Sequence, residues 1–349
     1  MEIFRWLWDA TVLHNLMAGT PTLLLLLLIV ICIALLSIGA DWMIDGVVAL
    51  AERTGLPKII IGATIISLGT TMPEAFVSVM AAWMGNPGLA LGNGVGSIIA
   101  DTGLIFGLTC ILAPIPVNRF ILNRTGWVQV GVATLLVIIS IHAFVSMSGH
   151  PVLNRWVGIF FLILLVGYMY LTYRWSRQHT VFSEESHDDT CIENTGRCWV
   201  MVVGGLFMVV AGARILVPAA AEIALRIGVP EDVIAATMVA LGTSLPELMT
   251  AFASIRKGHP DIIVGNLVGA DVLNCLFVIG AAAAVRPLSI PPNFFIFHFP
   301  AMLIILYSFR TFIFMNRDGG FRKWQGMWLL GVYLIYVILQ YTINIDIPG

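Results

Sequence analysis

Two glutamates lie in the same six-residue setting at two places in the chain. The sequence Gly-Thr-Thr-Met-Pro-Glu ends at Glu74, and Gly-Thr-Ser-Leu-Pro-Glu ends 173 residues later at Glu247, each within a long apolar segment. A charged side chain at the centre of a membrane helix raises the free energy of insertion by roughly 2.5–3.5 kcal/mol. Because two carboxylates occur in equivalent places despite this penalty, the pattern predicts a cation-binding site.

The proline of each motif predicts a local break in helical hydrogen bonding. Pro73 has no N–H to donate to the carbonyl of Gly69, and Pro246 has the same effect on the carbonyl of Gly242. Each motif should therefore present bare carbonyl oxygens beside hydroxyl groups and a carboxylate. Irregular backbone at membrane depth is tolerated where it is buried in protein or lines a cavity. Hard oxygen ligands of this kind suit sodium or calcium.

A second polar element follows each motif, at residues 92–101 and 265–274. Both begin with Gly-Asn and carry another glycine four residues after the first, a spacing that lets a neighbouring membrane helix approach closely. The same elements contain Ser97, Asp101 and Asn274. These three side chains could ligate ions, or they could form hydrogen bonds between helices.

The repetition extends well beyond the motifs. Residues 55–101 and 228–274 align without a gap and share 16 identities in 47 positions. The chain also has 59% hydrophobic and 11% charged residues, with a mean hydropathy of +0.94. Soluble proteins average about 25% charged residues, so the composition predicts a duplicated unit embedded in a bilayer. A net charge of −2 without a basic cluster argues against binding to nucleic acid.

Apolar segments of about 20 residues predict the membrane-spanning helices. Because each copy contains five of them, an odd number, the second copy must enter the membrane upside down, as in many secondary transporters. The predicted fold is therefore an all-α integral membrane protein with ten transmembrane helices in two inverted five-helix repeats. The predicted spans are 22–44, 58–82, 88–113, 126–148 and 153–173 in the first repeat, and 197–219, 231–255, 261–285, 293–313 and 324–345 in the second.

The long polar stretch near the middle of the chain reads as a linker between the repeats. This divides the chain into an N-terminal interfacial segment (1–21), a first repeat (22–173), a central linker (174–196) and a second repeat (197–349). Lys and Arg are concentrated in loops on the linker's side of the membrane, which predicts a cytoplasmic linker and external termini. The opposite side holds only Arg5, Arg155, Arg226 and Arg286.

These motifs resemble those of the cation/calcium exchanger superfamily, specifically its prokaryotic-type sodium/calcium exchanger branch. That family has two inverted repeats, each with a Gly-Thr-Ser-x-Pro-Glu element and a later Gly-Asn-x-x-Gly-Ser-Asn-like element. The resemblance covers essentially the whole chain, including Gly-Ala-Asp at 39–41 and its counterpart at 212–214. It implies ion ligation by Glu74, Glu247, Thr70, Thr71, Thr243, Ser244, Ser97, Asp101 and Asn274, with calcium held by Glu74, Glu247, Thr70 and Thr243.

Three departures from the family pattern affect the expected coupling ion. Ala270 stands where the second copy would usually offer a serine hydroxyl, whereas Ser97 keeps the hydroxyl in the first copy. The acid is Asp101 in the first copy and the amide is Asn274 in the second. Asp271 is an additional carboxylate whose orientation the sequence does not determine. Outside these motifs, Asp41 and Asp45 are interpreted as solvated or paired with Arg53.

The resemblance implies a secondary active antiporter, not an enzyme, that exports calcium against an inward flow of sodium. No cofactor and no obligatory protein partner are expected, only the transported ions and the lipid bilayer. The expected location is a prokaryotic cytoplasmic membrane. The alternatives are an antiporter driven by protons, with Asp101 or Asp271 titrating, a cation channel, and an intramembrane aspartyl protease, for which no catalytic motif is present.

Overall fold

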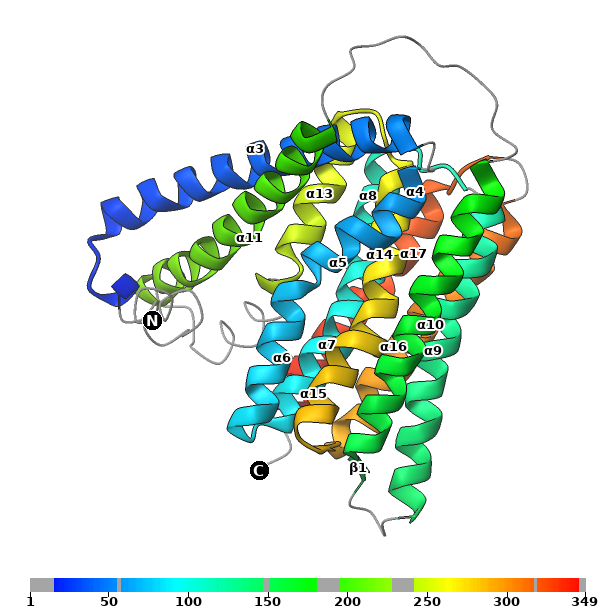
Figure 1. Cartoon of the computed structure of the whole chain (residues 1–349). Helices are drawn as coiled ribbons and strands as arrows, with labels where there is room; N and C mark the ends of the chain where they lie inside the picture. Colours follow the sequence, from blue (N-terminus) through cyan, green and yellow to red (C-terminus); the bar gives the residue numbers. More distant parts are fainter. Residues whose placement is uncertain are drawn as a thin grey trace.

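The computed structural model describes residues 16–54, 58–117, 119–146, 151–180, 195–227, 242–316 and 319–344. The chain is almost entirely helical in these ranges (Figure 1), which confirms the predicted helical class. Two short strands, β1 (Val152–Leu153) and β2 (Leu288–Ser289), pair antiparallel in the loops. The predicted interfacial segment at 1–21 and the linker at 174–196 lie largely outside the described residues.

Each predicted span of the first copy corresponds to helix in the structure. The elements are α3 (Thr22–Thr54), α4 (Lys58–Ile61), the π-helical η1 (Gly62–Ile66), α5 (Ser67–Thr70), α6 (Met72–Met84), α7 (Pro87–Ile99), the π-helical η2 (Ala100–Phe106), α8 (Gly107–Leu112), α9 (Arg119–Ser146) and α10 (Arg155–Thr180). However, α3 ends ten residues later than predicted, α9 begins seven residues earlier and α10 ends seven residues later.

The second copy repeats this order. Its described elements are α11 (Thr195–Arg226), α13 (Leu245–Arg256), α14 (Asp261–Leu273), the π-helical η3 (Asn274–Ile279), α15 (Gly280–Val285), the π-helical η4 (Phe294–His298), α16 (Phe299–Met315) and α17 (Lys323–Asn344).

Seven of the described helical stretches are long and apolar enough to cross a membrane, or eight if the bent pair Lys58–Thr70 and Met72–Met84 forms one span. The predicted span at 231–255 lies partly outside the described residues. The predicted span at 324–345 corresponds to α17, which is helical but is not one of the seven. The length and the apolar composition of these helices therefore indicate a multi-pass membrane protein.

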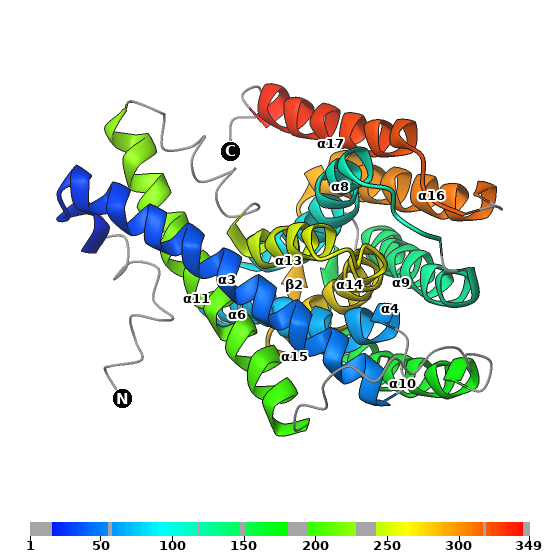
Figure 2. The ribbon, with the colours of Figure 1, turned by 90° about the horizontal axis from the view of Figure 1, so that it is seen from above.

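The two longest helices, α3 and α11, run antiparallel along each other on one side of the molecule (Figure 2). Arg53, near the end of α3, donates to the hydroxyl of Thr195 at the start of α11 at 2.6 Å. Arg226, at the end of α11, donates to the hydroxyl of Thr22 at the start of α3 at 2.8 Å. Arg226 is the counterpart of Arg53 at the 173-residue offset, and Thr195 is the counterpart of Thr22. The repeat therefore extends to the first residue of α3.

The hairpins of the two copies point in opposite directions (Figure 1). The turn between α6 and α7 contains Gly85 with φ of 86°, and the turn between α13 and α14 contains Gly258 with φ of 76°. Lys58, at the start of α4, contacts His259 of the second turn at 3.2 Å. Arg286, just after α15, lies beside Gly85 of the first turn. The α14–α15 helix therefore runs parallel to α4–α6, and antiparallel to its own counterpart α7–α8.

Glycines of the second copy allow α14 to pack directly on the backbone of η1 and α4. A Cβ on Gly269 would lie 2.5 Å from the carbonyl oxygen of Ala63, and a Cβ on Gly265 would overlap the carbonyl oxygen of Ile59. The predicted close approach is thus confirmed for this copy. In the first copy, a Cβ on Gly96 would meet no described atom within 4 Å.

Ion pairs connect α3 to the end of α13. Arg256 contacts Asp41 at 2.5 Å, and Lys257 contacts Asp45 at 2.8 Å. The expected pairing with Arg53 is therefore wrong, whereas the expected solvation is confirmed, because the Asp41 and Asp45 side chains are 32% and 47% exposed. Arg53 lies too far along α3, where it reaches Thr195 of the neighbouring helix instead.

Candidate functional site

A bend in the helix places the first glutamate at a new helix N-terminus. Lys58–Thr70 and Met72–Met84 meet at Thr71 with an angle of 41°, next to Pro73, which cannot continue the hydrogen-bond ladder. Glu74 consequently lies in the first turn of α6, and Glu247 lies in the first turn of α13. Unpaired N–H groups make helix N-termini favourable places for negative charge.

The break in the first copy does not leave the carbonyl of Gly69 bare, as the motif predicted. The N–H of Thr71 donates to the carbonyl of Ser67 at 2.9 Å, and the carbonyl of Gly69 accepts a backbone N–H at the break. A tighter turn at this point satisfies the oxygen that the proline leaves without its usual partner. The side chains, and not this carbonyl, therefore supply the free oxygens of the first motif.

Eight of the nine predicted ion ligands are buried, and Thr243 is half-buried. Coulombic interactions link Glu74 with Glu247 and Asp101, and Asp101 also with Glu247. Thr70 of the first copy lies beside Glu247 of the second, and Ser244 of the second lies beside Asp101 of the first. The tertiary structure thus interleaves the two motifs into one cluster, in which each copy's hydroxyls face the other copy's carboxylates.

Many oxygens of this cluster have no hydrogen-bond partner, although they are shielded from solvent. A buried polar group without a partner destabilises a fold by about 1–3 kcal/mol, and more if it is charged. No Lys or Arg ion pair among the described residues reaches the carboxylates. The free atoms are Thr71 Oγ1, both Glu74 Oε atoms, Ser97 Oγ, both Asp101 Oδ atoms, Ser244 Oγ, Glu247 Oε2 and Asn274 Oδ1.

These free oxygens do not amount to a conventional metal centre of acidic and histidine ligands. Within the described ranges, no three His, Cys, Asp or Glu side chains come close enough to hold one metal ion. A cation here would take ligands of mixed type, hydroxyl and amide oxygens as well as carboxylates, from both copies. Oxygen-only ligation of this kind fits hard cations such as sodium and calcium.

Two π-helical turns occur at equivalent places in the copies and contain predicted ligands. Asp101 lies in η2 (Ala100–Phe106), and Asn274 begins η3 (Asn274–Ile279). A π-helical turn widens the backbone locally and is frequently found at functional sites. The aligned sequences of these turns contain no proline or other signal that would have predicted the change in helix type.

The two asparagines that follow the glycines of the second polar elements were not among the predicted ligands. Asn93 donates to the backbone carbonyl of Glu74 at 3.1 Å and accepts from the hydroxyl of Thr243 at 3.3 Å. Asn266, its counterpart, donates to the hydroxyl of Thr250 at 3.2 Å. Asn93 therefore ties both motifs together. Its presence in both copies was the signal that could have identified it.

Asp271, whose orientation the sequence left open, contacts two residues that were not among the predicted ligands. Thr102 Oγ1 and Gln129 Nε2 both donate to Asp271 Oδ2, each at 2.5 Å. Gln129 lies on α9, so a helix that carries none of the predicted ligands also reaches Asp271.

Comparisons with known proteins identify the family of this chain. The family described as sodium/calcium exchanger protein matches residues 24–174 and 197–342. The chain belongs to this exchanger family. Among relatives, it is 30% identical over 309 residues to the uncharacterized membrane protein MJ0091 of Methanocaldococcus jannaschii, covering 87% of this chain and 93% of the relative.

Other exchanger-family members are similar over nearly their whole length. The sodium/calcium exchanger MaX1 of Methanosarcina acetivorans is 26% identical over 334 residues, covering 87% of this chain and 95% of the relative. A solved structure of the sodium-calcium exchanger NCX_Mj superimposes with a TM-score of 0.77 at 26% identity, covering 91% of this chain and 99% of the other. The family match and the structural similarity thus both cover nearly the whole chain.

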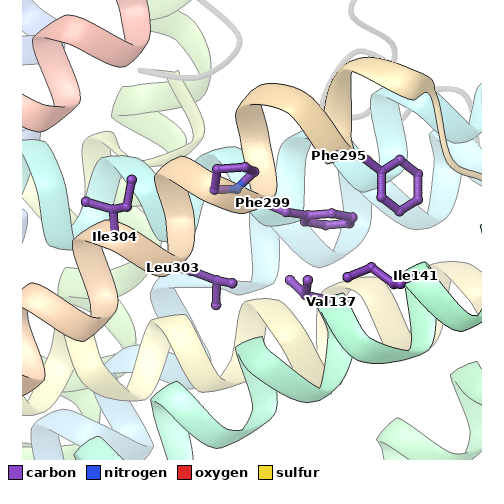
Figure 3. Close-up of a pocket in the computed structure, with 7 residues that line it drawn as sticks. Val137, Ile141, Phe295, Phe299, Leu303 and Ile304 are labelled. Atoms are coloured by element: carbon purple, nitrogen blue, oxygen red, sulfur yellow. The ribbon is translucent and has the colours of Figure 1, made fainter.

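The exchanger chain also has an apolar groove that does not belong to the polar cluster. It has a volume of about 380 Å³ and lies between α9 and the η4–α16 helix, where Val137 and Ile141 face Phe299 and Leu303 (Figure 3). Side chains of this kind offer no ligands to a cation. This groove is therefore not a candidate cation site.

Proposed function

We propose that this protein is a secondary active antiporter that exchanges calcium for sodium across a membrane. The observation that carries the proposal is the set of buried oxygens without hydrogen-bond partners around Glu74 and Glu247. Two buried carboxylates without a cationic partner are stabilised by a bound cation, which offsets their charge. The names of the relatives MaX1 and NCX_Mj indicate which cations these are.

In this proposal calcium is held between the two motifs, with sodium and calcium competing for overlapping ligands. Glu74 and Glu247 provide the charge, and Thr70 and Thr243 provide oxygens for calcium. Calcium takes about six to eight oxygens, more than either copy offers alone. The remaining ligands are Thr71, Ser244, Ser97, Asp101 and Asn274.

Exchange, as opposed to leak, follows from the electrostatics of the empty site. An empty site with several unneutralised carboxylates would have to pass through a low-dielectric interior, where unpaired charge is heavily penalised. A cation-loaded site is neutralised, so the loaded protein can change the side on which the site is open. Ten transmembrane helices in two inverted repeats suit such alternating access, by movement of one bundle against another around a central site.

The proposal predicts sodium-driven calcium uptake by proteoliposomes. Vesicles loaded with sodium and diluted into sodium-free buffer should accumulate calcium, because outward sodium flow drives inward calcium movement. Empty vesicles and vesicles containing the Glu74→Gln variant are the controls. Uptake that follows an imposed pH gradient and ignores the sodium gradient would replace sodium with protons as the coupling ion. Ion currents without counter-ion dependence would indicate a channel.

The proposed orientation places the central linker in the cytoplasm of a prokaryotic cell and both termini outside. On a cysteine-free background, we expect Ser289→Cys to react with a membrane-impermeant maleimide added to intact cells. Lys323→Cys should react only after the membrane is opened. Both positions are exposed in loops or at a helix end, so accessibility depends on the side of the membrane. The reverse labelling pattern would invert the orientation.

A further inference from the structure

A polar contact between three helices lies beside the glutamate pair. Thr102 on η2 and Gln129 on α9 both donate to Oδ2 of Asp271 on α14, at 2.5 Å each. Each of the three residues is 1% exposed. The contact joins the two copies, because Asp271 belongs to the second and its donors belong to the first.

The fold does not require polar groups at these positions. At the 173-residue offset, the counterparts of Asp271, Thr102 and Gln129 are Ile98, Cys275 and Met302. All three counterparts are buried members of one apolar core. The equivalent helix contact in the other copy is therefore made by apolar side chains. Replacing a buried charged group by apolar residues of similar volume is often neutral or stabilising, so a purely structural role does not account for Asp271.

Several free oxygens surround this contact. Both donors bond Oδ2 of Asp271, which leaves Asp271 Oδ1 and Gln129 Oε1 buried without a partner. Asn274 lies three residues after Asp271, hence on the same helix face, and its Oδ1 is also free. Asp101 directly precedes Thr102, interacts electrostatically with Asp271 and has two free oxygens. No Lys or Arg ion pair among the described residues reaches either aspartate.

We propose that Asp271, Gln129, Asp101 and Asn274 form a second cation position, next to the glutamate pair, that binds a monovalent metal ion of the sodium type. Two carboxylates supply the charge, and the amide oxygens of Gln129 and Asn274 complete an oxygen-only ligand set. The free oxygens are five in number, fewer than the about six to eight that calcium takes. The inference rests on the proposed exchange. It gives one coupling ion a binding position that has no polar counterpart at the 173-residue offset.

The test is the thermal stability of the purified full chain in detergent, titrated with sodium chloride at constant ionic strength and, separately, with calcium chloride. A ligand that binds only the folded state raises the melting temperature, and the rise grows with the logarithm of its concentration above the Kd. In Asp271→Asn and in Gln129→Leu, we expect the sodium concentration needed for a given rise in melting temperature to increase about tenfold or more, because a charge or an oxygen ligand is lost. The calcium response should change by less than about threefold, since Glu74 and Glu247 are intact.

The variant Thr102→Cys/Gln129→Met/Asp271→Ile copies the apolar counterpart and tests folding separately from binding. It should give a folded, monodisperse protein that responds to calcium and has lost the high-affinity sodium response. Asp261→Asn, on the same helix but outside the cluster, should behave as wild type in both titrations.

Three results would overturn the second cation position. The first is an unchanged sodium response in Asp271→Asn and Gln129→Leu. The second is a stabilisation that follows pH and not sodium, which would make a proton the occupant. The third is loss of the folded state in the triple variant, which would make the contact structural. A wild-type protein that responds to sodium but not to calcium would instead refute the proposed exchange and leave this position standing.

Discussion

Calcium uptake should fall at least about a hundredfold when Glu74 or Glu247 is changed to Gln. The amide keeps the shape of the side chain and removes the charge that holds a divalent ion. Two unit charges about 4 Å apart interact by about 4 kcal/mol at an effective dielectric constant near 20, and a divalent ion doubles this value. A hundredfold fall in calcium uptake corresponds to only about 2.8 kcal/mol. Loss of a fraction of this charge–charge interaction is therefore enough to produce it.

The measurement is the initial rate of calcium uptake into proteoliposomes with a fixed sodium gradient. Asp261→Asn is the matched control, because it removes a carboxylate at the partly exposed start of α14 and should leave transport unchanged. Gel filtration and the melting temperature must show that both Gln variants are folded. Both Oε atoms of Glu74 and Oε2 of Glu247 are buried without a hydrogen-bond partner, and the Gln side chain has nearly the same size as Glu. Wild-type flux in either variant would contradict the assignment of that glutamate to the site.

The second large effect is expected from Gly265→Ala, which should lower the free energy of unfolding by about 1–3 kcal/mol or more. The added Cβ would overlap the carbonyl oxygen of Ile59 on α4. Backbone cannot move aside as a flexible side chain can, so α14 would have to shift away from α4 and η1. That shift would also displace Asp271 and Asn274, which lie further along the same helix, and transport should fall with stability.

Gly167→Ala on α10 is the control for this substitution. A Cβ at Gly167 meets no described atom within 4 Å, and alanine has the higher helix propensity. The melting temperatures of both variants in detergent give the comparison. A melting temperature for Gly265→Ala equal to that of Gly167→Ala would show that α14 is not held at the close distance described above.

The amino-acid sequence was sufficient to identify the helices and the two motifs, because both are encoded locally. A membrane helix satisfies its own backbone within one segment, so hydropathy predicted α3, α9 and α16 near their observed positions. The repeat at a constant offset also predicted that Glu74 and Glu247 are equivalent. An odd number of spans per copy then predicted inversion, in agreement with the opposed turns at Gly85 and Gly258.

Contacts between residues far apart in the chain could not be predicted in this way. Asp41 pairs with Arg256, 215 positions later, and not with the nearby Arg53, because the crossing of α3 over α13 decides which charges meet. Gln129 lies outside every motif, and only the packing of α9 against α14 brings it to Asp271.

The sequence by itself thus determined which oxygen-bearing side chains the candidate site contains, because the motifs that carry them occur twice at a constant offset. The tertiary structure decided their pairing, with Thr70 beside Glu247 and Ser244 beside Asp101 across the two copies. It also decided that the Gly69 carbonyl is satisfied while side-chain oxygens are free. The physical reason is that ligand sets form between helices. Periodicity describes each helix separately, whereas close approach at residues such as Gly265 and Gly269 sets which faces meet.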